Sequence, residues 1–240
     1  INNKFFEYSL LSLTLLYPIF FIIGNFAINL SLICMIFLSI LFFNPRSNLI
    51  KLDKKLVILI LIFFLYLIIS SFNSYYIKFS LLKSLGYFRF FLFVIFFVLI
   101  LNKFNSKIQL FGKILIFSSL FVIIDSYIQL FFGKDLFGFP DDKAYGRLSG
   151  PFGDELIVGN YVLFFGILGI CLLSYNNKIK KINLIFFFFL IGIFCFMSGE
   201  RNSFLSFLIF IFFLFFLSKE KIPIILSLLL VFIFSTILFF

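Results

Sequence analysis

Arginine is the residue type in this sequence best suited to holding a charged substrate, and it is used sparingly. Of the 20 basic residues, only Arg46, Arg89, Arg147 and Arg201 are arginines. A guanidinium group presents a planar fork of N–H donors that holds two oxygens of a phosphate or carboxylate at once, which the ammonium group of lysine cannot do. Any one of Arg89, Arg147 and Arg201 could instead reach lipid headgroups or pair with an acid such as Glu200, Asp154 or Asp125. Three together, with Lys83 six residues before Arg89, favour an anion-binding site.

Arg147 lies in the most polar stretch of the chain, residues 146–161. Glycines and a proline over 150–153 predict a turn. Asp154 and Glu155 follow, and negative side chains there favour a helix start because they complement the helix dipole. The stretch would hold Arg147 close to a membrane surface.

Arg201 lies in a second polar knot, residues 196–204, between two phenylalanine-rich runs. A turn of this kind needs only glycine and serine. Glu200 and Arg201 therefore add a charged pair that the turn itself does not require.

Asp125 and Gln129 are polar residues inside an apolar run, and their spacing of four places both on one helix face. A carboxylate inside a membrane helix is costly unless it faces the bundle interior and has a partner. Two interpretations remain open. Asp125 could form a structural pair with an arginine, or it could serve a proton relay or catalysis.

The elements that must position these residues are membrane helices. The chain is 63% hydrophobic and only 12% charged, which leaves too little polar surface for a water-soluble globule. Helices satisfy their own backbone groups in lipid, whereas a β-barrel would show alternation instead of unbroken apolar runs. The sequence predicts an all-α, polytopic transmembrane helix bundle.

About nine spans are expected from apolar run length. They form one transmembrane domain over residues 1–240, which we expect to be cut short at both ends, since it lacks an initiator Met and stops inside an apolar run. The predicted spans lie near residues 8–23, 26–43, 56–71, 84–101, 114–132, 156–175, 184–198, 204–217 and 223 onward.

The charges of the connecting loops predict the orientation. Most basic residues fall near residue 4 and in alternate loops, at 46–55, 103–113, 178–181 and 219–221. The positive-inside rule places these loops and the N-terminus in the cytoplasm. The loops at 72–83 and 133–155 and the turn at 198–203 then face outward, so Lys83, Arg89, Arg147 and Arg201 lie on or near the outer side.

Other site classes are not indicated. The net charge of +10 comes from short loops, where orientation explains it better than nucleic-acid binding. Cys34, Cys171 and Cys195 lie in apolar helices without metal-ligand spacing. We expect no metal, no cofactor and no nucleic-acid partner.

The two polar stretches resemble the bacterial O-antigen ligase and O-antigen polymerase family of membrane glycosyltransferases. In that family an arginine, a glycine and an aromatic residue lead into a span, and a later Ser-Arg-Gly-type turn opens another. This chain departs from the family in reading Asp154-Glu155 where many members have Pro-Asn. The first pattern is carried by Arg147, Gly150 and Phe152, and the second by Ser198, Gly199, Glu200, Arg201 and Ser203.

The resemblance implies a multi-pass enzyme of the bacterial inner membrane, active in lipopolysaccharide or other surface polysaccharide biosynthesis. Its substrate would be a glycan on a polyprenyl diphosphate such as undecaprenyl diphosphate, moved on the outer face to a growing glycan or to lipid A core. Arg147 and Arg201 would grip the diphosphate. Arg89 and Lys83 would assist.

The general base for the acceptor hydroxyl is not evident, because the chain has no histidine. The family resemblance implies a larger external loop further along that supplies one, and Glu200 and Asp154 are the candidates within this chain. The alternative function is a transporter or flippase for an anionic solute or a lipid-linked glycan, in which polar residues such as Asp125 and Gln129 line a pathway.

Overall fold

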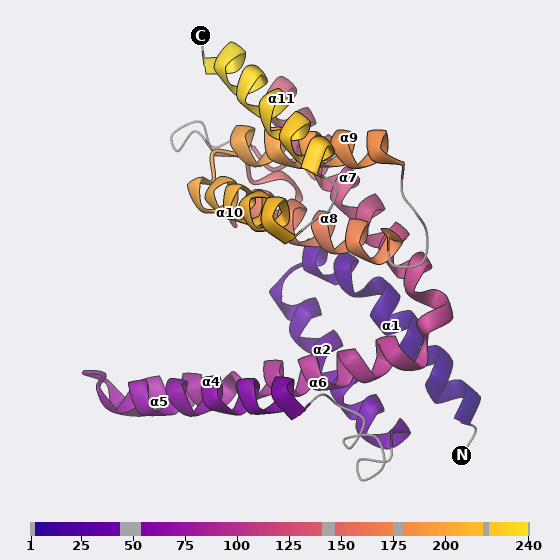
Figure 1. The fold of residues 1–240 in the computed structure, drawn as a ribbon. Coiled ribbons are helices and arrows are strands. Elements are labelled where there is room, and N and C mark those ends of the chain that lie inside the picture. The colour runs from indigo at the N-terminus through magenta and orange to yellow at the C-terminus, as the bar shows by residue number, and fades with distance from the viewer. Residues whose placement is uncertain (1–2, 44–53, 141–146, 175–179, 218–220, 240) are drawn as a thin grey trace. The chain divides into compact units, whose positions relative to one another are not determined.

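A computed structural model describes residues 3–43, 54–140, 147–174, 180–217 and 221–239. These residues are helical apart from turns and an isolated bridge between Lys134 and Pro140 (Figure 1). Two of the elements, η2 and η3, are single 3₁₀ turns. The elements are α1 Asn3–Ile23, α2 Asn25–Phe42, α4 Lys54–Phe72, α5 Ile77–Gly86, α6 Phe88–Lys103, η2 Asn105–Lys107, α7 Ile108–Phe132, η3 Gly150–Phe152, α8 Val158–Ser174, α9 Lys181–Met197, α10 Arg201–Leu217 and α11 Lys221–Phe239.

The all-helical class and the membrane character are confirmed for the described part of the chain. Four helical stretches are long and apolar enough to cross a membrane: Phe5–Ile23, Asn25–Phe42, Ile77–Lys103 and Asn105–Phe132. Five further apolar stretches, of 10–17 residues each, lie within α4, α8, α9, α10 and α11. Each predicted apolar run overlaps a described helix, and the run at 84–101 covers the end of α5 and most of α6. Such runs satisfy their backbone groups in lipid as helices.

The outer loop predicted at 72–83 is shorter than expected. The α5 helix begins at Ile77, so Lys83 lies on a helix. Tyr87 keeps a right-handed helical conformation between α5 and α6, and this makes the two nearly continuous. The Ser84 hydroxyl also lies 2.6 Å from the Ser71 hydroxyl, which ties α5 to the end of α4.

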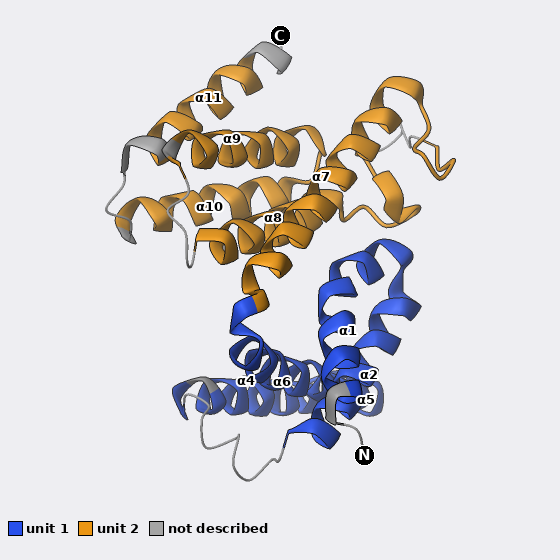
Figure 2. Ribbon diagram, turned by 90° about the vertical axis from the view of Figure 1, so that its right-hand side faces the viewer, with its two compact units in different colours: residues 1–106 blue, residues 107–240 orange. Residues whose placement is uncertain are grey.

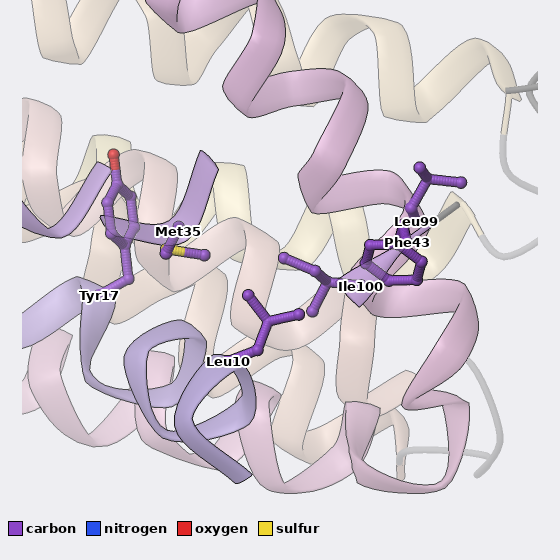
Figure 3. Packing of buried hydrophobic residues seen from close by; sticks show 6 residues of the cluster. All are labelled: Leu10, Tyr17, Met35, Phe43, Leu99 and Ile100. Carbon is purple, nitrogen blue, oxygen red and sulfur yellow. The ribbon is translucent and has the colours of Figure 1, made fainter. Parts of the chain in front are cut away.

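The chain divides into two compact units, residues 1–106 and residues 107–240 (Figure 2). Unit 1 has a hydrophobic core where α1 and α2 meet the end of α6. Within it, the Tyr17 ring stacks on Phe93 with the ring centroids 4.9 Å apart. The buried members drawn in Figure 3 are Leu10, Tyr17, Met35, Phe43, Leu99 and Ile100.

Unit 2 is built on close packing of α7 against α8. Gly112 and Gly169 face each other, and a Cβ added to Gly169 would lie 3.1 Å from the Gly112 carbonyl oxygen. Small residues at a helix interface allow this approach of two backbones in membrane proteins. This contact lies near the N-terminal end of α7 and the C-terminal end of α8, and the polar stretches lie at the opposite end of the pair.

Candidate functional site

Gln129 fixes the loop that leads into α8. Its side chain is fully buried on α7, and its Oε1 accepts hydrogen bonds from the amides of Ser149, at 3.1 Å, and Gly150, at 2.8 Å. Its Nε2 donates to the Ser149 hydroxyl, at 2.9 Å, and to the Pro140 carbonyl, at 3.2 Å. Both acceptor positions and both donors of the amide are therefore used.

Asp125 fixes an earlier part of the same loop. It is fully buried, and its Oδ1 accepts a hydrogen bond of 2.9 Å from the Leu136 amide. Asp135, next to Leu136, closes a tight turn by accepting from the amides of Phe137, at 3.0 Å, and Phe139, at 2.6 Å. The hydrogen-bond partner observed for Asp125 is thus a loop amide, whereas the sequence had offered an arginine.

Glu200 caps α8 from a distant part of the chain. Its side chain is only 5% exposed. Its Oε1 accepts from the Gly159 amide at 2.7 Å and its Oε2 from the Asn160 amide at 3.3 Å. These are amides of the first turn of α8, where a negative charge complements the helix dipole.

The expectation that Asp154 and Glu155 begin α8 is wrong. The helix starts at Val158, and the preceding residues form η3 and a turn. Gly153 adopts a φ of 63°, in the left-handed region, so a right-handed helix cannot run through this residue. Glu200 supplies the negative charge instead, and Asp154 and Glu155 remain exposed.

Opposing effects set the ionisation of Glu200, which lies in the turn between α9 and α10. Burial raises its pKa above the usual value, while the amides of Gly159 and Asn160 and the nearby Arg147 guanidinium act to lower it. Burial is the largest of these effects. Both carboxylate oxygens are already occupied by amides, so Glu200 is built as a structural anchor.

The segments that carry Arg147 and Arg201 meet at this end of unit 2. The Leu148 amide donates to the Ser198 carbonyl at 3.2 Å, joining the residue after Arg147 to the turn before Arg201. Arg147 also lies close enough to Glu200 to interact with it electrostatically. Both arginines are exposed, and Arg201 is the first residue of α10.

Lys83 and Arg89 belong to unit 1. Both are exposed, on α5 and at the start of α6 respectively. The guanidinium carbon of Arg89 lies 5.0 Å from the centroid of the Phe90 ring, a distance at which a cation is attracted to the ring face. Their part in a diphosphate site stays a prediction.

Serines to which the sequence interpretation gave no binding role complete the arrangement. Ser149 exchanges two hydrogen bonds with Gln129, and the hydroxyl of the buried Ser198 accepts from the Glu200 amide at 3.4 Å. Both serines lie within the two polar stretches, but serine is common in any turn. Among the described residues, no group of three or more His, Cys, Asp or Glu residues could hold a metal ion.

No protein-family model, no curated protein and no solved structure matches this chain. The resemblance to the O-antigen ligase and polymerase family therefore stays a prediction from two short motifs.

Replacing Glu200 by Gln is expected to flatten the response of stability to pH. Because the pKa of Glu200 is raised, its contribution to stability is present at acid pH and falls as the pH rises above the usual value of 4.5. A glutamine side chain in its place cannot titrate. The unfolding midpoint of the wild type should therefore fall relative to Glu200→Gln between about pH 4 and 8, on the order of 2–4 °C for each kcal/mol involved.

The matched control for this measurement is Asp154→Asn, which removes an exposed carboxylate nearby. Its midpoint should follow the wild type across the same pH series. Parallel curves for Glu200→Gln and the wild type would show that the buried carboxylate does not titrate in this way.

Proposed function

We propose that this chain is part of a membrane glycosyltransferase that moves a glycan from a polyprenyl diphosphate to a sugar hydroxyl. The observation that supports it most is the hydrogen bond from Leu148 to Ser198, because it holds the segments of Arg147 and Arg201 at one end of unit 2. Two guanidinium groups on neighbouring segments suit an anion with two phosphate groups.

The proposed setting is the outer face of a bacterial inner membrane. About nine spans with a cytoplasmic N-terminus would place this end of unit 2 outside. A lipid-linked diphosphate has its headgroup at the membrane surface, where the exposed Arg147 and Arg201 side chains could reach it. The acceptor would be a growing glycan or lipid A core.

The proposed chemistry depends on stabilising the leaving group. The bond between the anomeric carbon and the diphosphate oxygen breaks, and negative charge develops on the diphosphate as the acceptor oxygen attacks the same carbon. Fixed guanidinium groups that face this charge stabilise the transition state more than the ground state. Arg147 and Arg201 would take this role.

The proton of the acceptor hydroxyl must pass to a general base. Glu200 is poorly suited to this, because its two carboxylate oxygens accept the amides of Gly159 and Asn160. Asp154 is exposed and is the better candidate of the two within this chain. A base from outside the residues described here would also satisfy the chemistry.

A transporter or flippase is the second candidate function. The buried carboxylate of Asp125 inside α7 favours it, since ionisable groups within membrane helices often line ion or substrate pathways. The hydrogen bonds that Asp125 and Gln129 make with the loop favour a structural role. We therefore place the transferase first.

Depletion of the full-length protein in its host separates these functions. A transferase predicts that surface glycan is lost while lipid-linked precursor accumulates on the outer face, where an added lectin can reach it. A flippase predicts precursor trapped on the cytoplasmic side. Unchanged surface glycan together with unchanged precursor would contradict both glycan functions and leave the transport of a small anion.

A further inference from the structure

Among the described residues, most buried side-chain oxygens without a hydrogen-bond partner belong to α7 and the turn that follows it. Among the described residues there are four such side-chain atoms, and one of them, Ser39 Oγ, lies in unit 1. The other three are Asp125 Oδ2, Ser126 Oγ and Asp135 Oδ2. Asp125 and Ser126 are fully buried and Asp135 is 6% exposed.

These three residues lie between α7 and the loop that follows it. Asp125 holds the amide of Leu136, the residue next to Asp135, and the two carboxylates interact electrostatically. Ser126 is adjacent to Asp125 on α7 and faces the later part of the same loop. A Cβ added to Gly150 would lie 2.5 Å from the Ser126 hydroxyl oxygen.

Each of the two carboxylates has one oxygen that accepts hydrogen bonds and one that does not. One oxygen of Asp125 and one of Asp135 accept backbone amides, which fixes the two side chains in place. The second oxygen of each is buried with no donor. Buried charges are very costly unless they are paired, and a buried oxygen without a partner is usually explained by a bound water or ion.

A bound cation would partner these oxygens and would also offset the repulsion between the two carboxylates. We propose that Asp125, Asp135 and Ser126 form a site for one monovalent cation, either Na⁺ or a proton shared between the carboxylates. Oxygen atoms are the ligands that Na⁺ requires, and two carboxylates close together can also share one proton. A Ca²⁺ ion would require six to eight oxygen ligands, usually with several carboxylates.

The site would stabilise the loop that carries Arg147. Its occupant neutralises repulsion between α7 and the turn at Asp135, and Gln129 then anchors the later part of the loop. This proposal does not rest on the transferase function. Its test measures protein stability and not glycan transfer. The cation site can therefore be confirmed when glycan transfer is not found, and glycan transfer can be confirmed when the cation site is not found.

The test is the thermal unfolding midpoint of the full-length protein in detergent with EDTA present. The midpoint is compared in NaCl and in choline chloride at equal ionic strength and pH 8, and then in choline chloride from pH 5 to 8.5. Binding of Na⁺ should raise the midpoint in NaCl by on the order of 5 °C. If the cation is a proton, the midpoint should instead fall as the pH rises even in the Glu200→Gln variant, with no response to Na⁺.

Asp125→Asn and Asp135→Asn keep the oxygen that accepts the loop amides but remove the negative charge. Each should lose the Na⁺ response, or the part of the pH response that persists in the Glu200→Gln variant. Asp154→Asn, which removes an exposed carboxylate, should keep it.

A midpoint that does not respond to Na⁺ in the wild type and does not respond to pH in the Glu200→Gln variant would overturn the proposal. The same responses in the wild type and in both Asn variants would overturn it equally, as would stabilisation by Ca²⁺ alone once EDTA is omitted. If Asp125→Asn does not fold, Asp135→Asn and the wild-type titration decide the matter.

Discussion

Arg147→Lys and Arg201→Lys are each expected to reduce glycan transfer by about 100-fold or more, the typical loss when one donor that faces developing charge is removed. The positive charge is unchanged in both variants. What is lost is the two-pronged contact with phosphate oxygens, which only a guanidinium group can make. The measurement is transfer by membranes that contain the full-length protein, together with the length distribution of the surface glycan.

Arg46→Lys is the matched control, because it is the same substitution at an arginine that the charge pattern places in the cytoplasm. Arg46 lies outside the described residues. The glycan-transfer activity of the Arg46→Lys variant should equal that of the wild type. Normal glycan ladders from both Arg147→Lys and Arg201→Lys would remove these residues from the proposed site.

Gln129→Leu is expected to cause the largest loss of stability. Leucine leaves the amides of Ser149 and Gly150, the Ser149 hydroxyl and the Pro140 carbonyl without their buried partner. A buried polar group left unsatisfied costs ~1–3 kcal/mol, so a total of roughly 3–5 kcal/mol is expected after partial relaxation. The shift in the unfolding midpoint measures the total loss of stability. Faster amide hydrogen exchange at Ser149 and Gly150 would show that the loss arises in this loop.

Gln109→Leu provides the control for this variant. Gln109 is also on α7 and is half-buried, and no side-chain hydrogen bond is described for it. The same change of residue type should therefore have little effect there. Equal midpoints for Gln129→Leu and Gln109→Leu would show that the loop does not depend on Gln129.

The positions of the helices could be predicted from the sequence because each follows from a local property. Unbroken apolar runs such as residues 184–198 and 204–217 leave a membrane helix as the form that satisfies the backbone. The helix at α5 was missed because residues 77–86 are more polar than a span. It packs against α4 through Ser71 and Ser84, a contact that the sequence does not reveal.

The contacts of the candidate site are harder to foresee because they join residues far apart in the chain. The spacing of Asp125 and Gln129 correctly placed them on one buried face of α7. It did not indicate that Gln129 binds Ser149 and Gly150, which lie 20 and 21 residues further on. Long-range partners of this kind are set by how helices pack.

Glu200 is a second residue whose long-range partners could not be predicted from the sequence. The nearest acidic residues to the start of α8 in sequence are Asp154 and Glu155, and local rules favour them as helix-start residues. The backbone turn at Gly153 moves the start to Val158 instead. The cap is then supplied by Glu200, 41 residues away from Gly159.

The most direct measurement is the affinity of the full-length protein for a short polyprenyl diphosphate, compared with the matching monophosphate. If Arg147 and Arg201 hold one diphosphate together, the diphosphate should bind more tightly, and Arg147→Ala and Arg201→Ala should each remove that preference. The double variant should then lose less than the two single losses added, as expected for residues that share a ligand. Equal affinity for both lipids, or losses that simply add, would contradict a shared diphosphate site.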